Sequence, residues 1–258
     1  MSKQKSLCRV RESVKLAPAV YSLWLEAPDI VKQALPGQFV SLYCQERDRL
    51  LPRPISICEL DRKAGSLRLV YRVVGAGTEE FSRLVSGDQI EVLGPLGNGF
   101  ECEGKRPLLI AGGIGIPPML ELAKQFGGSA TAVLGYRDSN MFLKEEFEGY
   151  ARVVIATDDG SAGTKGTVID AIGEQKLLED GVDVIYSCGP TPMLRGVKHF
   201  AQEHDIKAYL SMEERMACGV GACLACVCQS VEVDDHSKVK NKRVCKDGPV
   251  FLSTEVEL

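Results

Sequence analysis

Long apolar runs and an excess of positive charge are both missing from this chain of 258 residues. No apolar stretch approaches the roughly 20 residues that a membrane-spanning helix needs, so we expect no membrane partner. The formal net charge of −4 offers no basic surface for nucleic acid. Residues 1–11 carry basic side chains but lack the apolar core of a secretory signal, so the expected location is the cytoplasm.

Histidine is scarce, with only three in the chain: His199, His204 and His236. All lie in polar stretches without a nucleophile partner, and the first two are expected on an exposed helix. A Rieske centre needs two histidine ligands, and only His236 lies in the final segment. No conventional catalytic set is indicated, so redox chemistry would have to come from bound cofactors.

Cysteine, by contrast, is abundant and unevenly distributed. Five of the ten cysteines are scattered, and we interpret them as small buried residues: Cys8, Cys44, Cys58, Cys102 and Cys188. The other five crowd into the last 41 residues: Cys218, Cys223, Cys226, Cys228 and Cys245. Clustering of this kind in a cytoplasmic protein indicates a metal site rather than a disulfide framework.

The spacing of the clustered cysteines is specific. Cys218, Cys223 and Cys226 form the pattern C-x4-C-x2-C, and Cys245 follows after eighteen further residues. Plant-type [2Fe–2S] centres have this spacing, and small residues between the ligands let the loop wrap around the cluster. Cys228 is too close to Cys226 to reach the other side of a cluster, so we prefer Cys245 as the fourth ligand. Zinc held by four cysteines remains the alternative, although such sites pair two short knuckles.

The hydrophobic pattern divides the chain into three segments and predicts an α+β multidomain fold. Residues 1–103 contain short strand-like runs separated by turns, which is typical of a small antiparallel β-barrel. In residues 67–74, apolar side chains alternate with Arg68 and Arg72, which predicts a strand with one buried face. A helix is expected over residues 78–85, with Thr78 as its N-cap.

From about residue 104 the pattern changes to continuous apolar strands that alternate with helical stretches. This alternation is typical of a doubly wound α/β nucleotide-binding domain, which we place at residues 104–209. Residues 210–258 contain the cysteine cluster and are too few to bury a large core. We therefore expect a small third domain that its metal centre holds together.

Two motifs in the first segment can bind a flavin nucleotide. In residues 53–56, Arg53 can pair with a pyrophosphate, and Ser56 can hydrogen-bond a flavin ring. Residues 75–78 contain two glycines before the predicted helix, where the backbone can approach a phosphate. Each motif is a weak signal alone, because Arg-Pro turns and glycine-rich connections are common.

Two motifs in the second segment indicate a nicotinamide nucleotide. Gly112, Gly113 and Gly115 follow a buried strand and precede a helix, the context of a dinucleotide loop, although they do not complete the G-x-G-x-x-G fingerprint. Cys188 comes directly before a Gly-Pro pair near the end of another apolar strand. It is either a small buried residue or a neighbour of the nicotinamide.

Together these motifs resemble the ferredoxin–NADP reductase family, with Ile55 where its flavin motif commonly has an aromatic residue. The order of barrel, nucleotide domain and C-terminal cysteines, with the Asp-Gly-Pro-Val-Phe run at 247–251, is similar to the electron-transfer subunit of class 1B dihydroorotate dehydrogenase. The resemblance implies FAD held by Arg53, Pro54, Ile55, Ser56, Val70, Tyr71, Arg72, Gly77 and Thr78. It implies NAD beside Gly112, Gly113, Gly115, Cys188, Gly189 and Pro190. It also implies one [2Fe–2S] cluster on Cys218, Cys223, Cys226 and Cys245.

The resemblance also implies a partner and a direction for the electrons. Nicotinamide transfers two electrons as hydride and a cluster transfers one, whereas a flavin can do both and so belongs between them. Electrons from dihydroorotate would reach the FMN of a catalytic partner subunit, then the cluster, FAD and finally NAD+, in pyrimidine (UMP) biosynthesis.

Other proteins with the same three-part layout remain alternatives. They are subunits of NADPH-dependent ferredoxin oxidoreductases, sulfide dehydrogenases and soluble hydrogenases. A different class is a flavin reductase whose cysteine segment binds structural zinc and needs no partner. Arg137 and Asp138 follow a predicted strand and carry opposite charges. The sequence therefore does not decide between NAD and NADP.

Overall fold

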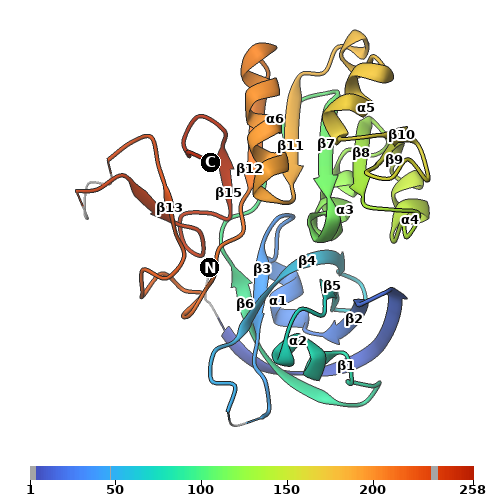
Figure 1. The fold of residues 1–258 in the computed structure, drawn as a ribbon. Coiled ribbons are helices and arrows are strands. Elements are labelled where there is room, and N and C mark those ends of the chain that lie inside the picture. Colours follow the sequence, from blue (N-terminus) through green and yellow to red (C-terminus); the bar gives the residue numbers. More distant parts are fainter. Residues whose placement is uncertain (1–3, 47, 234–237) are drawn as a thin grey trace.

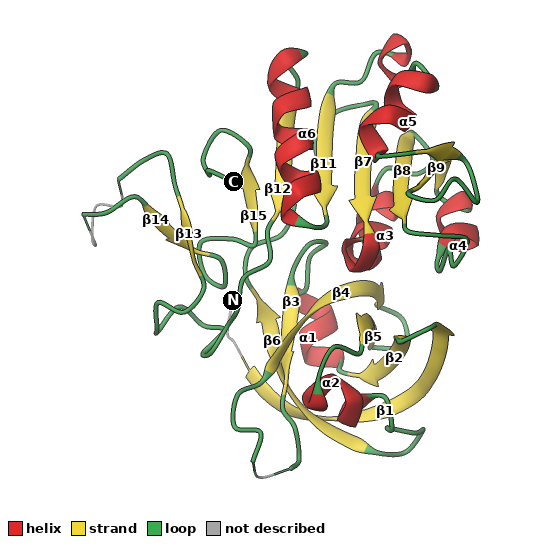
Figure 2. Cartoon of the chain, in the orientation of Figure 1, coloured by secondary structure: helices red, strands yellow, loops and turns green. Residues whose placement is uncertain are grey.

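The structure divides into three parts that follow the order of the chain (Figure 1). The computed structural model describes residues 4–46, 48–233 and 238–258. An antiparallel barrel comes first, an α/β domain lies against it, and the C-terminal segment lies beside both (Figure 2). His236 and residues 1–3 lie outside the described residues. None of the described helices combines the length and the apolar character that a membrane crossing requires.

The first part is a closed barrel in which all neighbouring strands are antiparallel, as the sequence predicts. Around the barrel the strands are β1 (Gln4–Ala17), β2 (Val20–Glu26), β5 (Ser66–Arg72), β4 (Arg53–Asp61), β3 (Phe39–Leu42) and β6 (Gln89–Leu96). Every second side chain of a strand points inward, so residues such as Leu23, Leu69 and Val92 fill the interior and are fully buried. The helix α1 (Pro28–Gln33) adds Ile30 to this core.

Two local predictions in the barrel are wrong. Helix α2 spans Ala76–Phe81 instead of residues 78–85, and its N-cap is Gly75, while Thr78 is the third helical residue. Strand β5 is buried on both faces rather than on one. The reason is tertiary: the face that carries Arg68 is covered by the α/β domain, and the Arg68 side chain is buried there against acidic partners.

The second part is a seven-stranded sheet with helices on both faces, which confirms the predicted doubly wound domain. Its strands, in order, are β10 (Thr164–Lys165), β9 (Ala151–Thr157), β8 (Ala130–Tyr136), β7 (Pro107–Gly112), β11 (Val184–Cys188), β12 (Lys207–Ser211) and β15 (Val250–Leu252). All are parallel except β15, which is antiparallel to β12. The helices are α3 (Pro117–Gln125), α4 (Lys144–Glu148), α5 (Val168–Glu174) and α6 (Thr191–Glu203), with 3-10 turns at Gly113–Gly115 and Leu177–Asp180.

Strand β7 lies at the centre of this sheet, and its uninterrupted apolar sequence is buried on both faces. Leu109 packs in the same core as α3 and α4, while Ile110 packs in the core that contains α5 and α6. From β7 the chain proceeds to β8 on one side and later returns to β11 on the other side. Doubly wound sheets bind ligands at the carboxyl ends of their strands where the order reverses in this way. These ends of β7 and β11 point toward the barrel (Figure 2).

The C-terminal part is small and shares its last strand with the α/β sheet. Strands β13 (Val227–Gln229) and β14 (Asn241–Arg243) form a ladder of their own, and β15 then joins β12. Strand β12 runs to Ser211, two residues past the segment end expected at 209. Cys226, Cys245 and Phe251 belong to the same apolar core as α5 and α6. The C-terminal part is therefore anchored on the α/β domain by its own packing.

Charged side chains join the barrel to the α/β domain. Arg68 on β5 pairs with Glu146 of α4 (Nη2–Oε1 3.1 Å) and with Glu59 on β4 (Nη1–Oε2 3.3 Å). The buried carboxylate of Glu121, on α3, accepts a hydrogen bond from the amide of Leu60 at 3.0 Å. These contacts set the position of the barrel relative to the two nucleotide motifs of the α/β domain.

Candidate functional site

The predicted flavin motifs come together where Arg53 meets Gly77. Arg53 is the first residue of β4, and Gly77 lies in the first turn of α2. A Cβ atom on Gly77 would lie 2.5 Å from the Nε atom of Arg53, so a larger residue would displace the guanidinium. The guanidinium also donates a hydrogen bond to the carbonyl of Leu51. A fixed positive charge beside free helix amides is suited to a phosphate group.

The rest of this motif forms the beginning of β4. Pro54, Ile55 and Ser56 pair with β3, where Ser56 lies opposite Phe39. All of the motif residues are half-buried, so one side of the strand is accessible at this end of the barrel. The backbone and the Ser56 side chain can therefore reach a ligand that lies along the strand.

Thr78 is placed in the same loop, but its hydroxyl is already engaged. The Oγ1 atom accepts hydrogen bonds from the amides of Val74 (3.0 Å) and Gly75 (3.3 Å) and donates one to the carbonyl of Gly75 (2.9 Å). The side chain thus shapes the turn into α2. Contact between Thr78 and a flavin nucleotide would have to come through its backbone amide.

The three residues predicted from the end of β5 are divided between the two faces of the strand. Val70 belongs to the core shared with the α/β domain, whereas Tyr71 points into the barrel. The Tyr71 hydroxyl is buried without a hydrogen-bond partner among the described residues, and burial raises its pKa. Arg72 is half-buried at the end of the strand. Val70 therefore presents its side chain to the junction between the domains, and Tyr71 does not.

The predicted nicotinamide motifs also come together, at the carboxyl ends of β7 and β11. A Cβ atom on Gly115 would lie 2.5 Å from the carbonyl carbon of Cys188 and 2.6 Å from the amide nitrogen of Gly189. The Gly115 backbone thus packs directly on the Cys188–Gly189 peptide. Gly113, two residues earlier, borders open space instead, since a Cβ atom on it would meet nothing within 4 Å. The two loops flank the reversal point of the sheet.

Sequence reasoning missed Met193, which lies over both loops. A Cβ atom on Gly112 would be 2.6 Å from the Met193 Sδ atom and 3.5 Å from Cδ of Pro190, and one on Gly189 would be 3.1 Å from the same sulfur. The signal available was only its position three residues after Pro190, in the first turn of α6. Cys188 itself is buried, and burial raises the pKa of its thiol to about 12. A neutral, compact thiol is therefore expected at this site.

The flavin and nicotinamide motifs face each other across the junction of the two domains. Strand β5 contacts the Gly113–Gly115 turn directly. Val70 from the barrel, with Ile116 and Cys188 from the α/β domain, belongs to one apolar core. A flavin ring at the start of β4 and the end of β5 would therefore lie next to a nicotinamide at the ends of β7 and β11.

The four predicted cluster cysteines form two pairs. The Sγ atoms of Cys218 and Cys223 are 3.3 Å apart, and the amide of Cys245 donates to the Sγ atom of Cys226 at 3.4 Å. Among the described residues no three cysteine, histidine or carboxylate side chains converge on a point suited to a single metal ion. Two pairs of thiols fit a binuclear [2Fe–2S] core, in which each iron takes two of them.

Backbone amides point at these sulfur atoms, as a cluster site requires. The amides of Val220 and Cys223 donate to Cys218 Sγ at 3.5 and 3.4 Å, and the amide of Gly221 donates to Cys245 Sγ at 3.2 Å. Gly221 has φ +84°, a conformation that other residues rarely adopt. Burial acts to raise the pKa of Cys218, but the hydrogen bonds that its own sulfur atom accepts together outweigh burial and lower the pKa to about 6. The loop thus favours a thiolate before any metal is bound.

Cys228 is near this group but not part of it. It lies on β13 and packs in the apolar core, where burial raises the pKa of its thiol to about 11. Cys245 is also buried, and its pKa is raised to about 12 by burial and by Cys226, but its sulfur receives the amide of Gly221. Cys245 stays the predicted fourth ligand.

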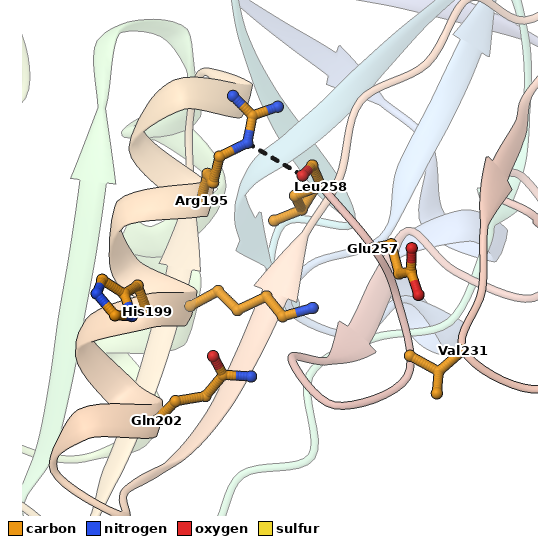
Figure 3. Close-up of a pocket in the computed structure, with 7 residues that line it drawn as sticks. Arg195, His199, Gln202, Val231, Glu257 and Leu258 are labelled. Atoms are coloured by element: carbon orange, nitrogen blue, oxygen red, sulfur yellow. Dashed lines mark hydrogen bonds between the residues drawn. The ribbon is translucent and has the colours of Figure 1, made fainter.

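A separate hollow of about 420 Å³ lies between α6 and the C-terminal tail (Figure 3). Arg195 on α6 donates from Nε to the carbonyl of Leu258 at 3.0 Å, and Lys198 donates to the carbonyl of Val256 at 2.6 Å. These cations hold the tail on the helix. None of the predicted site residues lines this hollow, so we assign it no part in the redox chemistry.

The fold and these motifs define a flavoprotein of the ferredoxin reductase type with an added cysteine centre. Family models match each part: an oxidoreductase FAD-binding domain at residues 8–100, an oxidoreductase NAD-binding domain at 109–199, and the iron–sulfur cluster binding domain of dihydroorotate dehydrogenase B at 213–257. The chain therefore has domains for FAD, NAD and an iron–sulfur cluster.

Curated relatives narrow the class to one family. The dihydroorotate dehydrogenase B (NAD(+)) electron transfer subunit of Listeria welshimeri is 47% identical over 258 residues, which cover 97% of this chain and 98% of that protein. The protein of the same name from Geobacillus sp. is 43% identical over 267 residues, with 100% of both chains covered. The chain belongs to the family of dihydroorotate dehydrogenase B electron transfer subunits.

Solved structures share the architecture. A chain of the NADH-dependent reduced ferredoxin–NADP oxidoreductase, determined to study flavin-based electron bifurcation, is 32% identical with a TM-score of 0.85, covering 98% of this chain and 90% of that chain. A ferredoxin–NADP+ reductase from Neisseria gonorrhoeae with bound FAD and NADP is 17% identical with a TM-score of 0.63, covering 78% and 91%. The second similarity is one of fold alone.

Proposed function

We propose that this chain connects the FMN of a dihydroorotate dehydrogenase catalytic subunit to NAD+ through its own [2Fe–2S] cluster and FAD, in the cytoplasm and as part of pyrimidine biosynthesis. When bound, the flavin exchanges electron pairs with nicotinamide and single electrons with the cluster. The protein's own contribution is to hold the three groups in this order and at fixed separations.

One observation supports the order cluster, FAD, NAD: the cysteine loop contacts the barrel strand that pairs with the flavin motif. A Cβ atom on Gly219, the residue after Cys218, would lie 3.0 Å from the Oγ atom of Ser41. Ser41 is on β3 and pairs with Pro54 of the flavin motif. The nicotinamide loops lie across the domain junction, where β5 meets the Gly113–Gly115 turn. The arrangement therefore supports a flavin site between the cluster site and the nicotinamide site.

The residues have separate tasks in this proposal. Arg53 holds the pyrophosphate of FAD with the amides of the α2 turn, and Ser56 hydrogen-bonds the flavin ring. The glycine loop and the Cys188–Gly189 peptide leave room for the nicotinamide, and the buried Cys188 thiol excludes water from its side. The amides directed at Cys218 and Cys245 stabilise negative charge on the cluster ligands and so tune its potential.

Two observations bear on the alternative subunits with the same layout. The curated relatives at 43% and 47% identity carry the dihydroorotate dehydrogenase name, whereas the ferredoxin–NADP oxidoreductase chain is 32% identical. The matched iron–sulfur family model also carries the dihydroorotate dehydrogenase name. Both favour the FMN-containing catalytic subunit as the partner over a ferredoxin.

The test is an anaerobic visible and EPR spectrum, with iron and sulfide analysis, of the wild type and the variants Cys245→Ser and Cys228→Ser. The wild type should contain about two iron per chain and show a reduced-cluster EPR signal with NADH. Cys245→Ser should lose that signal and retain FAD, while Cys228→Ser should retain both.

Other results would change the proposal in defined ways. Zinc without iron, with only the flavin reduced by NADH, would leave a simple flavin reductase. Loss of the cluster in Cys228→Ser but not in Cys245→Ser would reassign the fourth ligand. Failure of the purified catalytic subunit and dihydroorotate to reduce the cluster would reject the proposed partner.

A further inference from the structure

A single residue of the barrel, Asn98, is hydrogen-bonded to the segment that follows Cys245. Asn98 is exposed in the connection between β6 and β7. Its Nδ2 donates to the carbonyls of Asp247 (3.0 Å) and Val250 (3.1 Å), its Oδ1 accepts from the amide of Val250 (3.1 Å), and its own amide donates to the carbonyl of Gly248 (2.7 Å). The side-chain amide thus donates two hydrogen bonds and accepts one, all with backbone groups of this segment.

The segment bound by Asn98 is tied to the cysteine loop. The Asp247 carboxylate accepts hydrogen bonds from the amide of Arg243 (2.8 Å) and from its Nε (3.3 Å). The Arg243 guanidinium donates in turn to the carbonyl of Gly221 at 3.1 Å, and the amide of Gly221 donates to Cys245 Sγ. A continuous set of hydrogen bonds thus leads from Asn98 to the sulfur atoms.

On its other side, Asn98 is joined to the flavin motif. The carbonyl of Gly97, the preceding residue, accepts a hydrogen bond from the side chain of Gln38 at 2.7 Å. The carbonyl of Gln38 accepts from the amide of Ile57 at 3.0 Å, next to Ser56. Gln38 is buried, so solvent does not compete for these hydrogen bonds. Asn98 therefore lies between the flavin motif and the cysteine centre, with short hydrogen-bonded connections to both.

We propose that Asn98 is a positioning residue that sets the separation between the [2Fe–2S] cluster and FAD. The inference rests on the proposed function, because a separation is relevant only if electrons pass between the two groups. Packing of β15 against β12 holds the C-terminal part on the α/β domain. Asn98 supplies hydrogen bonds between this part and the barrel, where the flavin motif is, in addition to the contact of Gly219 with Ser41.

The experiment is anaerobic stopped-flow reduction by NADH of the wild type, Asn98→Ala and a control, Gln33→Ala. Gln33 is also a barrel residue whose amide donates to a backbone carbonyl, that of Asp29 at 3.2 Å, but it lies on α1. Flavin bleaching should have the same rate in all three. The following bleaching of the cluster should be roughly tenfold slower in Asn98→Ala alone, on the scale that small misplacements of reacting groups cause.

Hydrogen–deuterium exchange provides a readout that does not depend on turnover. The amide of Val250 and its neighbours should exchange faster in Asn98→Ala, with FAD and iron content unchanged. Asn98→Asp retains the acceptor for Val250 but loses both donors, so its cluster bleaching should be intermediate. If Asn98→Ala lost iron, the Asp variant would carry the kinetic test.

Three outcomes would overturn the inference. Unchanged cluster bleaching with faster exchange at Val250 would make Asn98 a merely structural contact. Equal slowing of flavin and cluster bleaching would mean that Asn98 affects the transfer from NADH to FAD. Loss of iron from both variants would show that Asn98 is needed to bind the cluster rather than to set its distance from FAD. Absence of cluster reduction in the wild type would instead reject the proposed function.

Discussion

The guanidinium of Arg53 lies against the backbone of Gly77, so close that a Cβ atom at Gly77 would be 2.5 Å from Nε and 2.9 Å from Cζ. The contact joins the start of β4 to the first turn of α2. Neither residue alone is a strong flavin signal. Together they place a positive charge and free helix amides on one spot, which is what a pyrophosphate requires.

Gly77→Ala should therefore weaken FAD binding. The added methyl group displaces the guanidinium, so the loss of one charge-assisted interaction predicts a rise in the dissociation constant of FAD of roughly 10- to 100-fold. Flavin content after dialysis and fluorescence titration of the apoprotein would measure it. Gly173→Ala, on α5, is the matched control, since a Cβ atom there meets nothing within 4 Å. Equal FAD affinity in both variants would contradict the assignment of this site.

Gly115→Ala should weaken the binding of NAD(H) and leave FAD in place. Its Cβ atom would collide with the peptide between Cys188 and Gly189, 2.5 Å from the carbonyl carbon, and push the two nicotinamide loops apart. We expect the KM for NADH to rise roughly tenfold or more, because a backbone cannot yield as a flexible side chain does. Gly196→Ala, on α6 with open space around its Cβ position, serves as the control. A normal KM in Gly115→Ala would indicate that nicotinamide binds elsewhere.

Arg68→Ala should destabilise the junction between barrel and α/β domain. The Arg68 side chain is 9% exposed, and its removal leaves Glu59 without this partner in a partly buried position. We expect a loss of about 2–4 kcal/mol in the free energy of unfolding, toward the lower end of the range for broken buried pairs because Glu146 is 41% exposed. Urea unfolding would measure it.

The control for Arg68 is Arg152→Ala. Arg152 pairs with Asp180 at 2.8 Å, but both side chains are more than half exposed, at 53% and 59%. Exposed pairs contribute at most about 1 kcal/mol. A similar loss of stability in both variants would show that the interdomain pair contributes no more to stability than an exposed pair does.

Glu121→Gln should alter the pH dependence of stability. Burial raises the pKa of Glu121 above its ordinary value, while the amide of Leu60 and Lys124 act against the rise. The folded protein thus binds this proton more tightly than the unfolded chain, so the stability that the protonated group contributes is lost as pH rises through the folded-state pKa. The glutamine variant cannot ionise, and it retains an acceptor for Leu60.

The melting temperature of Glu121→Gln should therefore match the wild type near about pH 4 and exceed it near about pH 8. Glu174→Gln, on the exposed end of α5, controls for the loss of one carboxylate. A gain that is equal at both pH values would contradict the raised pKa of Glu121. A loss at the higher pH would mean that Lys124 stabilises the Glu121 carboxylate as an anion.

Some features were predictable because they are local. The C-x4-C-x2-C spacing indicated the cysteine loop, since neighbouring ligands on a tight loop constrain one another along the chain. The continuous apolar sequence before Gly112 predicted a buried parallel strand, which the fold confirms, and a nucleotide loop after it. The roles of the individual residues at these sites stay predictions.

Other features depended on packing between distant segments. The alternation around Arg68 is a correct strand signal, but it cannot reveal that the α/β domain covers the charged face and makes Arg68 an interdomain partner. The N-cap preference of threonine misplaced the start of α2, because the N-cap there is Gly75 and the Thr78 hydroxyl is hydrogen-bonded to the loop before the helix. Capping preferences are statistical. The conformation of the local loop decides which residue occupies the N-cap position.

By itself, then, the sequence determined the three-part order, the barrel and doubly wound folds, and the group of thiols, because each follows from periodicity or from spacing over a few residues. Tertiary structure alone decided that Met193 covers the nicotinamide loops and that Asn98 links the barrel to the cysteine segment, 149 residues further along at Asp247. A hydrogen bond or contact between such distant segments leaves no periodic trace in the chain, because it forms only after the domains have packed.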